Sequence, residues 1–205
     1  MSRYDDELWE LVPEERGEPP AHVAEWVGGL GDTGRALDLG CGDGRLTGLL
    51  RAPEVVAADV SAVALERARR RLLEFRTVEL EPDAPLPFSD GEFDLVLCAD
   101  TIEHVRDVQL LLSEARRVLR PGGRLAVATP AHGRLTALGL AVRGFDAGFD
   151  PLSPHLRFFT RRSLRRLLGA MGFDVESLRR RRGDLLAVAS PASALRGRSS
   201  AASRR

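Results

Sequence analysis

The sequence predicts an α/β fold in which a mostly parallel sheet carries helices on both faces. Short apolar segments typical of buried strands alternate with longer amphipathic segments typical of helices. The first strand ends in a glycine-rich turn, Gly40–Gly44, which leads into the next element. The last two strands are separated by too few residues for a crossover helix, so the chain should close with an antiparallel hairpin.

Length and composition fit one compact domain. The 205 residues can bury a single sizeable core, and 43% apolar and 29% charged residues are ordinary values for a globular protein. No apolar run approaches the roughly 20 residues that span a membrane, and the N-terminus lacks the features of a signal peptide. Both cysteines, Cys41 and Cys98, fall inside predicted core elements. We therefore expect no disulfide framework and a cytoplasmic location.

The net charge of zero hides an asymmetry along the chain. Residues 1–100 contain 22 acidic residues and 10 arginines, whereas residues 101–205 contain 8 acidic residues and 20 arginines. Every basic residue is arginine. The basic half could attract an anionic substrate or nucleic acid. The alternative is a solvated surface followed by a charged tail.

The N-terminal segments precede the first strand. Residues 4–11 predict a short helix, and Ala21–Leu30 predict a second helix after a proline-rich loop. Residues 1–30 could form a lid or flank on the ligand site. Alternatively, Trp9 and Trp26 cover the sheet, as large aromatic side chains usually do.

The elements of the sheet follow in order. Strands are expected at 35–39, 54–60, 76–80, 93–98 and 124–128, and helices at 44–51, 62–74 and 108–119. The alternation stops after the fifth strand, and residues 131–159 predict an insertion on the substrate side. A helix at 163–171 precedes two strands, 173–178 and 185–189, joined by residues 179–184. Residues 191–205 predict a disordered tail.

The glycine-rich turn and the end of the second strand predict the ligand site. Gly40, Gly42 and Gly44 allow a sharp turn and a close approach of the backbone to a ligand. Asp59 ends the second strand, 19 residues after Gly40, where a carboxylate can accept hydrogen bonds from both hydroxyls of a ribose. These residues alone indicate a nucleotide-like ligand.

Four motifs in order resemble the class I S-adenosylmethionine-dependent methyltransferases of type 11/12, and more distantly the O-methyltransferases of ubiquinone biosynthesis. They are Leu37-Asp38-Leu39-Gly40-Cys41-Gly42-Asp43-Gly44, Ala58-Asp59, Leu86-Pro87-Phe88 before Phe93-Asp94, and Arg117-Val118-Leu119-Arg120-Pro121-Gly122-Gly123. The resemblance covers residues 35–190. It implies a Rossmann-like seven-stranded sheet whose last strand is antiparallel, within one domain over residues 1–190.

The resemblance also implies S-adenosylmethionine as cofactor and assigns its ligands. Asp38 and Gly40 would hold the amino-acid part, Asp59 the ribose and Val60 the adenine. Two acids, Glu81 and Asp83, are candidates for the adenine amino group, and Asp83 is preferred. The complete set is Asp38, Gly40, Cys41, Gly42, Asp59, Val60, Asp83, Ala84 and Cys98. Alternatively, Asp43 only caps the helix at 44–51 and Cys98 is an ordinary core residue.

Acidic and histidine residues follow the fourth strand and recur later in the chain. The spacing places Asp100, Glu103 and His104 on one side of a helical turn. With His155 they resemble the divalent-metal ligands of ubiquinone-biosynthesis and small-RNA methyltransferases. The alternative is a structural role for these groups, with His104 or His155 as the general base that removes the acceptor's proton.

The resemblance implies methyl transfer to a small-molecule acceptor, with oxygen as the expected nucleophile. One alternative is an RNA methyltransferase that uses the arginine-rich half. Against this alternative, the chain shows no added RNA-binding domain and no stacking platform. Another is a protein that binds S-adenosylmethionine without catalysis. The acceptor itself depends on how 1–30 and 131–159 fold, and the sequence does not give the oligomeric state.

Overall fold

The computed structural model describes residues 2–14, 17–133 and 154–193. Its strands are β1 (Arg35–Leu39), β2 (Glu54–Asp59), β3 (Arg76–Glu79), β4 (Phe93–Ala99), β5 (Leu119–Pro130), β6 (Phe173–Arg181) and β7 (Asp184–Pro191). Its helices are α1 (Ser2–Leu11), α2 (Ala21–Gly28), α3 (Ala62–Arg71), α4 (Val108–Val118) and α6 (Arg161–Ala170), together with the short 3-10 helix η1 (Thr47–Leu49).

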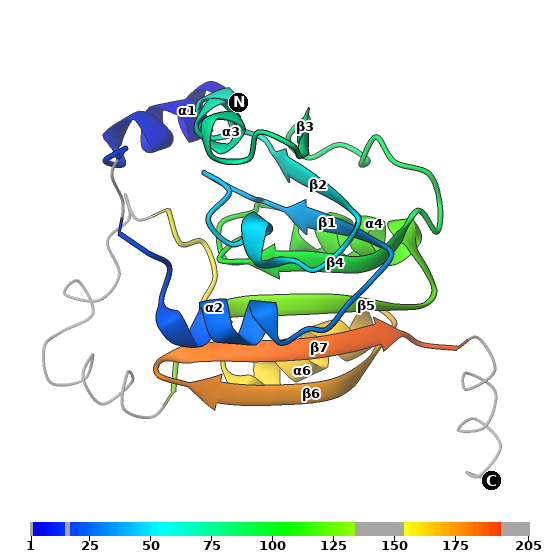
Figure 1. Cartoon of the computed structure of the whole chain (residues 1–205). Coiled ribbons are helices and arrows are strands. Elements are labelled where there is room, and N and C mark those ends of the chain that lie inside the picture. Colours follow the sequence, from blue (N-terminus) through cyan, green and yellow to red (C-terminus); the bar gives the residue numbers. More distant parts are fainter. Residues whose placement is uncertain (1, 15–16, 134–153, 194–205) are drawn as a thin grey trace, which may run out of the picture.

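The strands form one seven-stranded sheet in the order β3-β2-β1-β4-β5-β7-β6 (Figure 1). The first five strands in this order, from β3 across to β5, pair in parallel. Strand β7 lies between β5 and β6 and runs antiparallel to both. The predicted α/β architecture with its closing hairpin is therefore confirmed.

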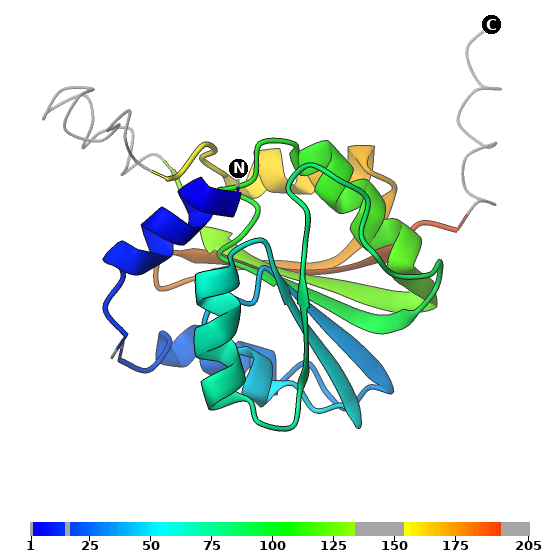
Figure 2. The same ribbon diagram turned by 90° about the horizontal axis from the view of Figure 1, so that it is seen from above.

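Helices cover both faces of the sheet because strand side chains alternate between them. Leu37 and Leu39 belong to the core cluster under α4 and α6, whereas Ala36 belongs to the cluster under α2. Figure 2 shows α4 and α6 on one face of the sheet and α2 and α3 on the other. Both faces are buried, which explains why the central strands are almost continuously apolar.

The predicted helix over residues 44–51 is wrong. These residues form turns followed by the single turn η1. Gly44 has φ +79°, outside the helical range, and the Oγ1 of Thr47 donates to the buried Asp38 carboxylate at 2.6 Å. Two glycines and a threonine also have low helix propensity.

The predicted connection over residues 179–184 is also too long. Strand β6 continues through Arg181, so the turn consists of Arg182 and Gly183, both with positive φ. Such a two-residue turn matches the twist of a hairpin. The arginine run therefore forms an exposed end of β6 rather than a loop.

Several predictions fall partly outside the described residues. Of the predicted insertion, residues 134–153 lie outside them, as do residues 194–205 of the predicted tail. Within the described ranges, no helix has both the length and the apolar character needed to cross a bilayer.

Two glycines near the end of α6 provide a test of where this helix ends. Gly172 ends the helix with φ +79°, while Gly169 lies inside it with open space where a Cβ would stand. We expect Gly172→Ala to lower the free energy of unfolding by about 1–2 kcal/mol, because a Cβ disfavours the left-handed region. Gly169→Ala should raise it by up to about 1 kcal/mol. Urea unfolding measures both, and a shift of both variants in the same direction would contradict the assignment.

Candidate active site

The carboxyl ends of β1 and β2 meet at the same edge of the sheet and carry the glycine-rich turn. Gly40 and Gly42 have φ of +80° and +54°, so only glycine adopts these positions without strain. The amides of Gly40 and Cys41 both donate to the Ala58 carbonyl, at 2.8 and 3.0 Å. The turn is therefore folded back onto the end of β2.

Asp59 completes this attachment through its side chain. Its carboxylate accepts hydrogen bonds from the amide of Gly42 at 2.8 Å and from the amide of Ser61 at 3.0 Å. Burial raises the pKa of Asp59, while the two amides oppose that shift. A single carboxylate thus fixes both the turn after β1 and the start of α3.

Asp38 is the second buried carboxylate at this edge. It is 2% exposed and accepts the hydrogen bond from Thr47. Burial raises its pKa to about 7, and the neighbouring charge of Asp59 acts in the same direction. Asp38 is therefore held near its point of half-ionisation at neutral pH.

Two side chains lie directly against the glycines of the turn. A Cβ on Gly40 would stand 2.5 Å from the Oγ1 of Thr101, and a Cβ on Gly42 would stand 2.7 Å from the Trp9 ring. Both distances are shorter than a real contact allows. Glycine is thus required here by packing as well as by backbone conformation.

Helix α1 brings Trp9 to the turn and is attached to α3, beside which it lies (Figure 1). Its Asp6 accepts from the Ser61 hydroxyl at 2.7 Å and from the Val63 amide at 3.2 Å. Arg67 of α3 lies over the Trp9 ring and donates to the Val12 carbonyl. Trp9 thus lies against the turn rather than the sheet, whereas Trp26 packs on the core cluster under α2.

The remaining residues predicted to bind cofactor surround this edge. Cys98 is buried in β4, where burial raises the pKa of its thiol, and Val60 packs partly buried against the main core. Asp83 has φ +56° and pairs with Arg106 at 3.3 Å, next to the half-buried Ala84. Cys41 is 8% exposed, and burial likewise raises its pKa.

The loop after β4 is joined to the segment that precedes α6. The amides of Leu156 and Arg157 both donate to the Glu103 carbonyl, at 2.8 and 3.1 Å. The Arg157 guanidinium donates to the carbonyls of Val105 and Arg106. Segments some fifty residues apart in the chain are thereby held side by side.

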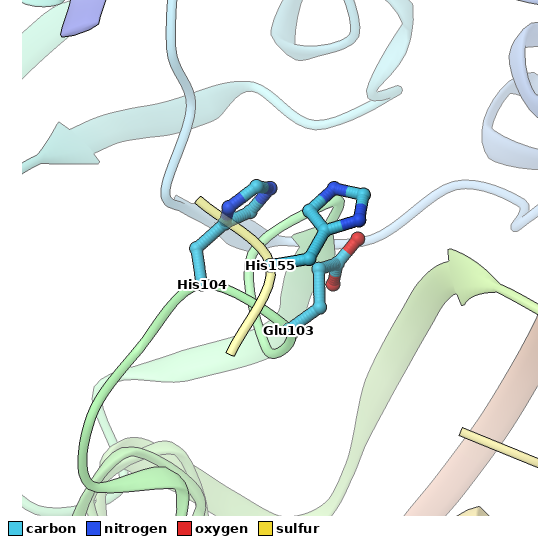
Figure 3. A group of neighbouring side chains, drawn as sticks. All are labelled: Glu103, His104 and His155. Atoms are coloured by element: carbon cyan, nitrogen blue, oxygen red, sulfur yellow. The ribbon is translucent and has the colours of Figure 1, made fainter. Parts of the chain in front are cut away.

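This junction gathers Glu103, His104 and His155 (Figure 3). One oxygen of Glu103 and one ring nitrogen of each histidine lie within 4.8 Å of one another. The two imidazole rings meet edge to face with centroids 4.7 Å apart. Three of the four residues predicted to bind a metal are thus brought together.

Asp100 does not join this group. Its backbone is left-handed, with φ +52°, and the turn that follows covers only residues 102–104. The single helical turn predicted for Asp100, Glu103 and His104 is therefore wrong. Asp100 is nevertheless near enough for its charge to raise the pKa of Glu103.

Glu103 is the most buried member, with 1% of its surface exposed. Its Oε2 accepts from the Thr129 hydroxyl at 2.9 Å, whereas its Oε1 has no hydrogen-bond partner among the described residues. Burial raises its pKa to about 7. The carboxyl group is thus set between its charged and neutral forms.

His104 has a defined tautomer. Its Nδ1 lies 3.0 Å from the Pro154 carbonyl, which can only accept, so Nδ1 carries the proton and Nε2 has the free lone pair. Burial lowers the pKa of His104, and the neighbouring His155 adds to that effect. His104 is therefore held neutral and can accept a proton at Nε2.

Three contacts at the site were not predicted from the sequence. Thr101 lies just after β4 and Thr129 lies near the end of β5. Their positions at the carboxyl ends of strands were the only indication in the sequence that they could reach the ligand edge. His132 stacks edge to face on Phe158, and burial beside His155 lowers its pKa. Nothing in the sequence places these side chains next to Gly40, Glu103 or His155.

Comparison with known proteins shows that the sequence is similar to methyltransferases. A family model described as a methyltransferase domain matches residues 37–127. The ubiquinone biosynthesis O-methyltransferase of Chelativorans sp. is 38% identical over 117 residues, which make up 55% of this chain and 46% of that protein. The malonyl-acyl-carrier-protein O-methyltransferase of Methylococcus capsulatus is 34% identical over 175 residues, 80% of this chain and 62% of that protein. The chain thus spans about half the length of these relatives.

Solved structures agree on the fold. An S-adenosylmethionine-dependent methyltransferase from Aquifex aeolicus superposes with a TM-score of 0.63 at 18% identity, covering 84% of this chain and 93% of its own. Residues 37–127 thus form a methyltransferase domain, in a sheet with the strand order of the class I S-adenosylmethionine-dependent methyltransferases, and the chain is distantly homologous to ubiquinone-biosynthesis O-methyltransferases.

The raised pKa of Asp38 predicts a pH dependence of stability. Its usual value is 3.8 and its folded value about 7, so between these values the folded state holds a proton that the unfolded state releases. Stability is therefore lost as the pH rises through about 7, by about 1.4 kcal/mol between about pH 6 and pH 8 from this group. Asp38→Asn should remove that share. Urea unfolding of both proteins at the two pH values measures it, and equal pH dependence would refute the assignment.

Proposed function

We propose that this chain transfers the methyl group of S-adenosylmethionine to an oxygen of a small-molecule acceptor. One observation carries the proposal. The glycine-rich turn fixed by Asp59 and the loop that carries Glu103 and His104 follow the neighbouring strands β1, β2 and β4 at one edge of the sheet, and His155 joins that loop from the segment before α6. The proposed cofactor cradle and the proposed proton-accepting groups therefore share one edge of the sheet. Two relatives named above are O-methyltransferases by name.

The residues present fit the cofactor. Asp38 and the turn over Gly40–Gly42 would hold its amino-acid part, and Asp59 with Val60 its adenosine. Asp83, Ala84 and Cys98 would complete the binding site. When bound, S-adenosylmethionine supplies a methyl group activated by the positive charge on sulfur. Buried carboxylates at this edge, Asp38 and Asp59, suit a cationic ligand.

Methyl transfer forms a bond from the acceptor oxygen to carbon as the sulfur–carbon bond breaks. The electron pair of that bond stays on sulfur, and the hydroxyl proton leaves to a base. His104 is prepared for this role, because its Nε2 is unprotonated and its ring is held by Pro154. His155 is the alternative base, since its ring lies against His104. Alignment of acceptor and methyl group provides the rest of the rate enhancement.

A divalent cation also fits this group. The unpaired Oε1 of Glu103 is buried, and a carboxylate with two imidazoles is a common donor set for Mn²⁺, Fe²⁺ or Zn²⁺. Glu103, His104 and His155 would hold the ion, with Asp100 outside the group of three. A bound ion would lower the pKa of an acceptor hydroxyl.

Two substitutions separate cofactor binding from chemistry. Asp59→Ala removes the acceptor of the Gly42 and Ser61 amides, so we expect S-adenosylhomocysteine to bind at least about tenfold more weakly. His104→Gln should leave that affinity within about twofold and abolish methylation across a panel of phenolic, enolic and carboxylic acceptors, because it removes the proposed base. Calorimetry and transfer of a labelled methyl group measure the two effects. Normal cofactor binding without turnover of any acceptor by the unaltered protein would instead indicate a non-catalytic binding protein.

The metal is tested on a different variant, Glu103→Gln, which replaces the carboxylate of the three proposed ligands. Calorimetric titration with Mn²⁺ should show one site in the unaltered protein and none in Glu103→Gln. If a chelator leaves methylation unchanged and Mn²⁺ does not bind, the base mechanism through His104 holds without the ion.

A further inference from the structure

Helix α6 presents four arginines to solvent. Arg161, Arg162, Arg165 and Arg166 are exposed, and none of them makes a hydrogen bond or ion pair with another described residue. The helix itself contains no acidic residue. Two of its leucines, Leu164 and Leu168, are fully buried in the core, and Leu167 is partly buried against it.

The arginines of α3 behave differently. Arg67 donates to the Val12 carbonyl, and Arg71 donates to the Asp43 carbonyl. Arg69 and Arg70 both pair with Glu66 of the same helix. Abundant arginine therefore does not by itself explain why the four arginines of α6 lack partners among the described residues.

The arrangement on α6 is electrostatically unfavourable for the helix alone. Arg161 faces Arg165, and Arg162 faces Arg166, at the i,i+4 spacing that makes like charges repel. The first two also lie at the N-terminus, where the helix dipole disfavours positive charge. The reciprocal hydrogen bonds of Thr160 and Ser163 hold this end. An anionic partner would relieve the repulsion.

Helices α4 and α6 cover the same face of the sheet (Figure 2), and a groove lined by residues of both helices and of the segment before α6 adjoins the arginines. Its volume is about 420 Å³. Five apolar residues, one serine and two arginines line it: Val108, Phe158, Phe159, Leu167, Ala170, Ser163, Arg157 and Arg166. The surface therefore combines two rows of positive charge with a recess for an apolar group.

We propose that α6 and this groove bind an acidic protein, which places carboxylates on the arginine rows and one apolar side chain in the groove. Carboxylates four residues apart on a partner helix are spaced about 6 Å along its axis, matching the arginine rows. Charge complementarity selects the partner, and the apolar recess favours a protein over nucleic acid. This surface does not depend on the proposed methyl transfer.

The two other anionic partners fit less well. A membrane-binding helix inserts its apolar face into lipid, but Leu164 and Leu168 of α6 face the core. Single-stranded nucleic acid needs aromatic platforms for its bases. Among the residues that line the groove, the exposed aromatic is Phe158, whose ring already packs on His132.

The test uses the full chain and a labelled synthetic helical peptide with glutamates four residues apart and a central leucine. Fluorescence anisotropy should show binding that weakens steeply with salt. Replacing Arg161, Arg162, Arg165 and Arg166 together by Gln should weaken it at least about tenfold. The matched control, Arg69→Gln with Arg70→Gln on α3, should change it by less than about twofold. Thermal melting should show that the α6 variant is at least as stable as the unaltered chain, since repulsion is removed.

Each outcome of the binding experiment either supports or overturns the proposal. Binding that follows α6 charge and weakens when the peptide leucine becomes serine supports the proposal. Absence of peptide binding, or equal loss in the α3 control, overturns it. Tighter α6-dependent binding of poly(U) RNA, or of anionic phosphatidylglycerol vesicles, would overturn it in favour of nucleic acid or membrane.

Discussion

The hydrogen bonds from the Gly42 and Ser61 amides to the Asp59 carboxylate are the interaction on which the site depends. They join the turn after β1 to the start of α3 across the ends of two parallel strands. A carboxylate that is 7% exposed requires such donors, because an unpaired buried charge is costly. The turn in turn requires glycine at 42, where φ is positive and Trp9 lies against the backbone. One buried acid thus fixes both the glycine-rich turn and the start of α3.

The same edge of the sheet contains two acidic side chains whose pKa values lie close to neutral pH. Asp38 and Glu103 both have pKa values raised to about 7 by burial, on the turn side and on the β4 side respectively. The hydrogen bonds that join residues 154–157 to the loop after β4 add two histidines to this edge. Burial, rather than any single ion pair, therefore raises the pKa values of the acids at this edge. A cationic ligand would lower these pKa values again and favour the charged carboxylates.

The strands and most helices were predictable because each carries its own local pattern. The buried runs around Leu37 and Val56, the Ser61 cap and the glycine stop at 172 agree with the structure. The helix over 44–51 was not predictable from periodicity, since the left-handed Gly44 and the Thr47–Asp38 bond override it. At the site, the sequence predicted that Glu103, His104 and His155 belong to one group, and the structure brings these three side chains together. The contacts of Thr129 and Trp9 depend on packing between distant segments, which no local pattern encodes.

The most direct test of the central claim is the amide spectrum of the protein during titration with S-adenosylhomocysteine. We expect saturable shifts of the Gly42 and Ser61 amide resonances at one common affinity, because both amides are held by the carboxylate that would bind the ribose. Saturable binding that leaves these two resonances unmoved, or no binding at all, would contradict the assignment of this turn as the cofactor cradle.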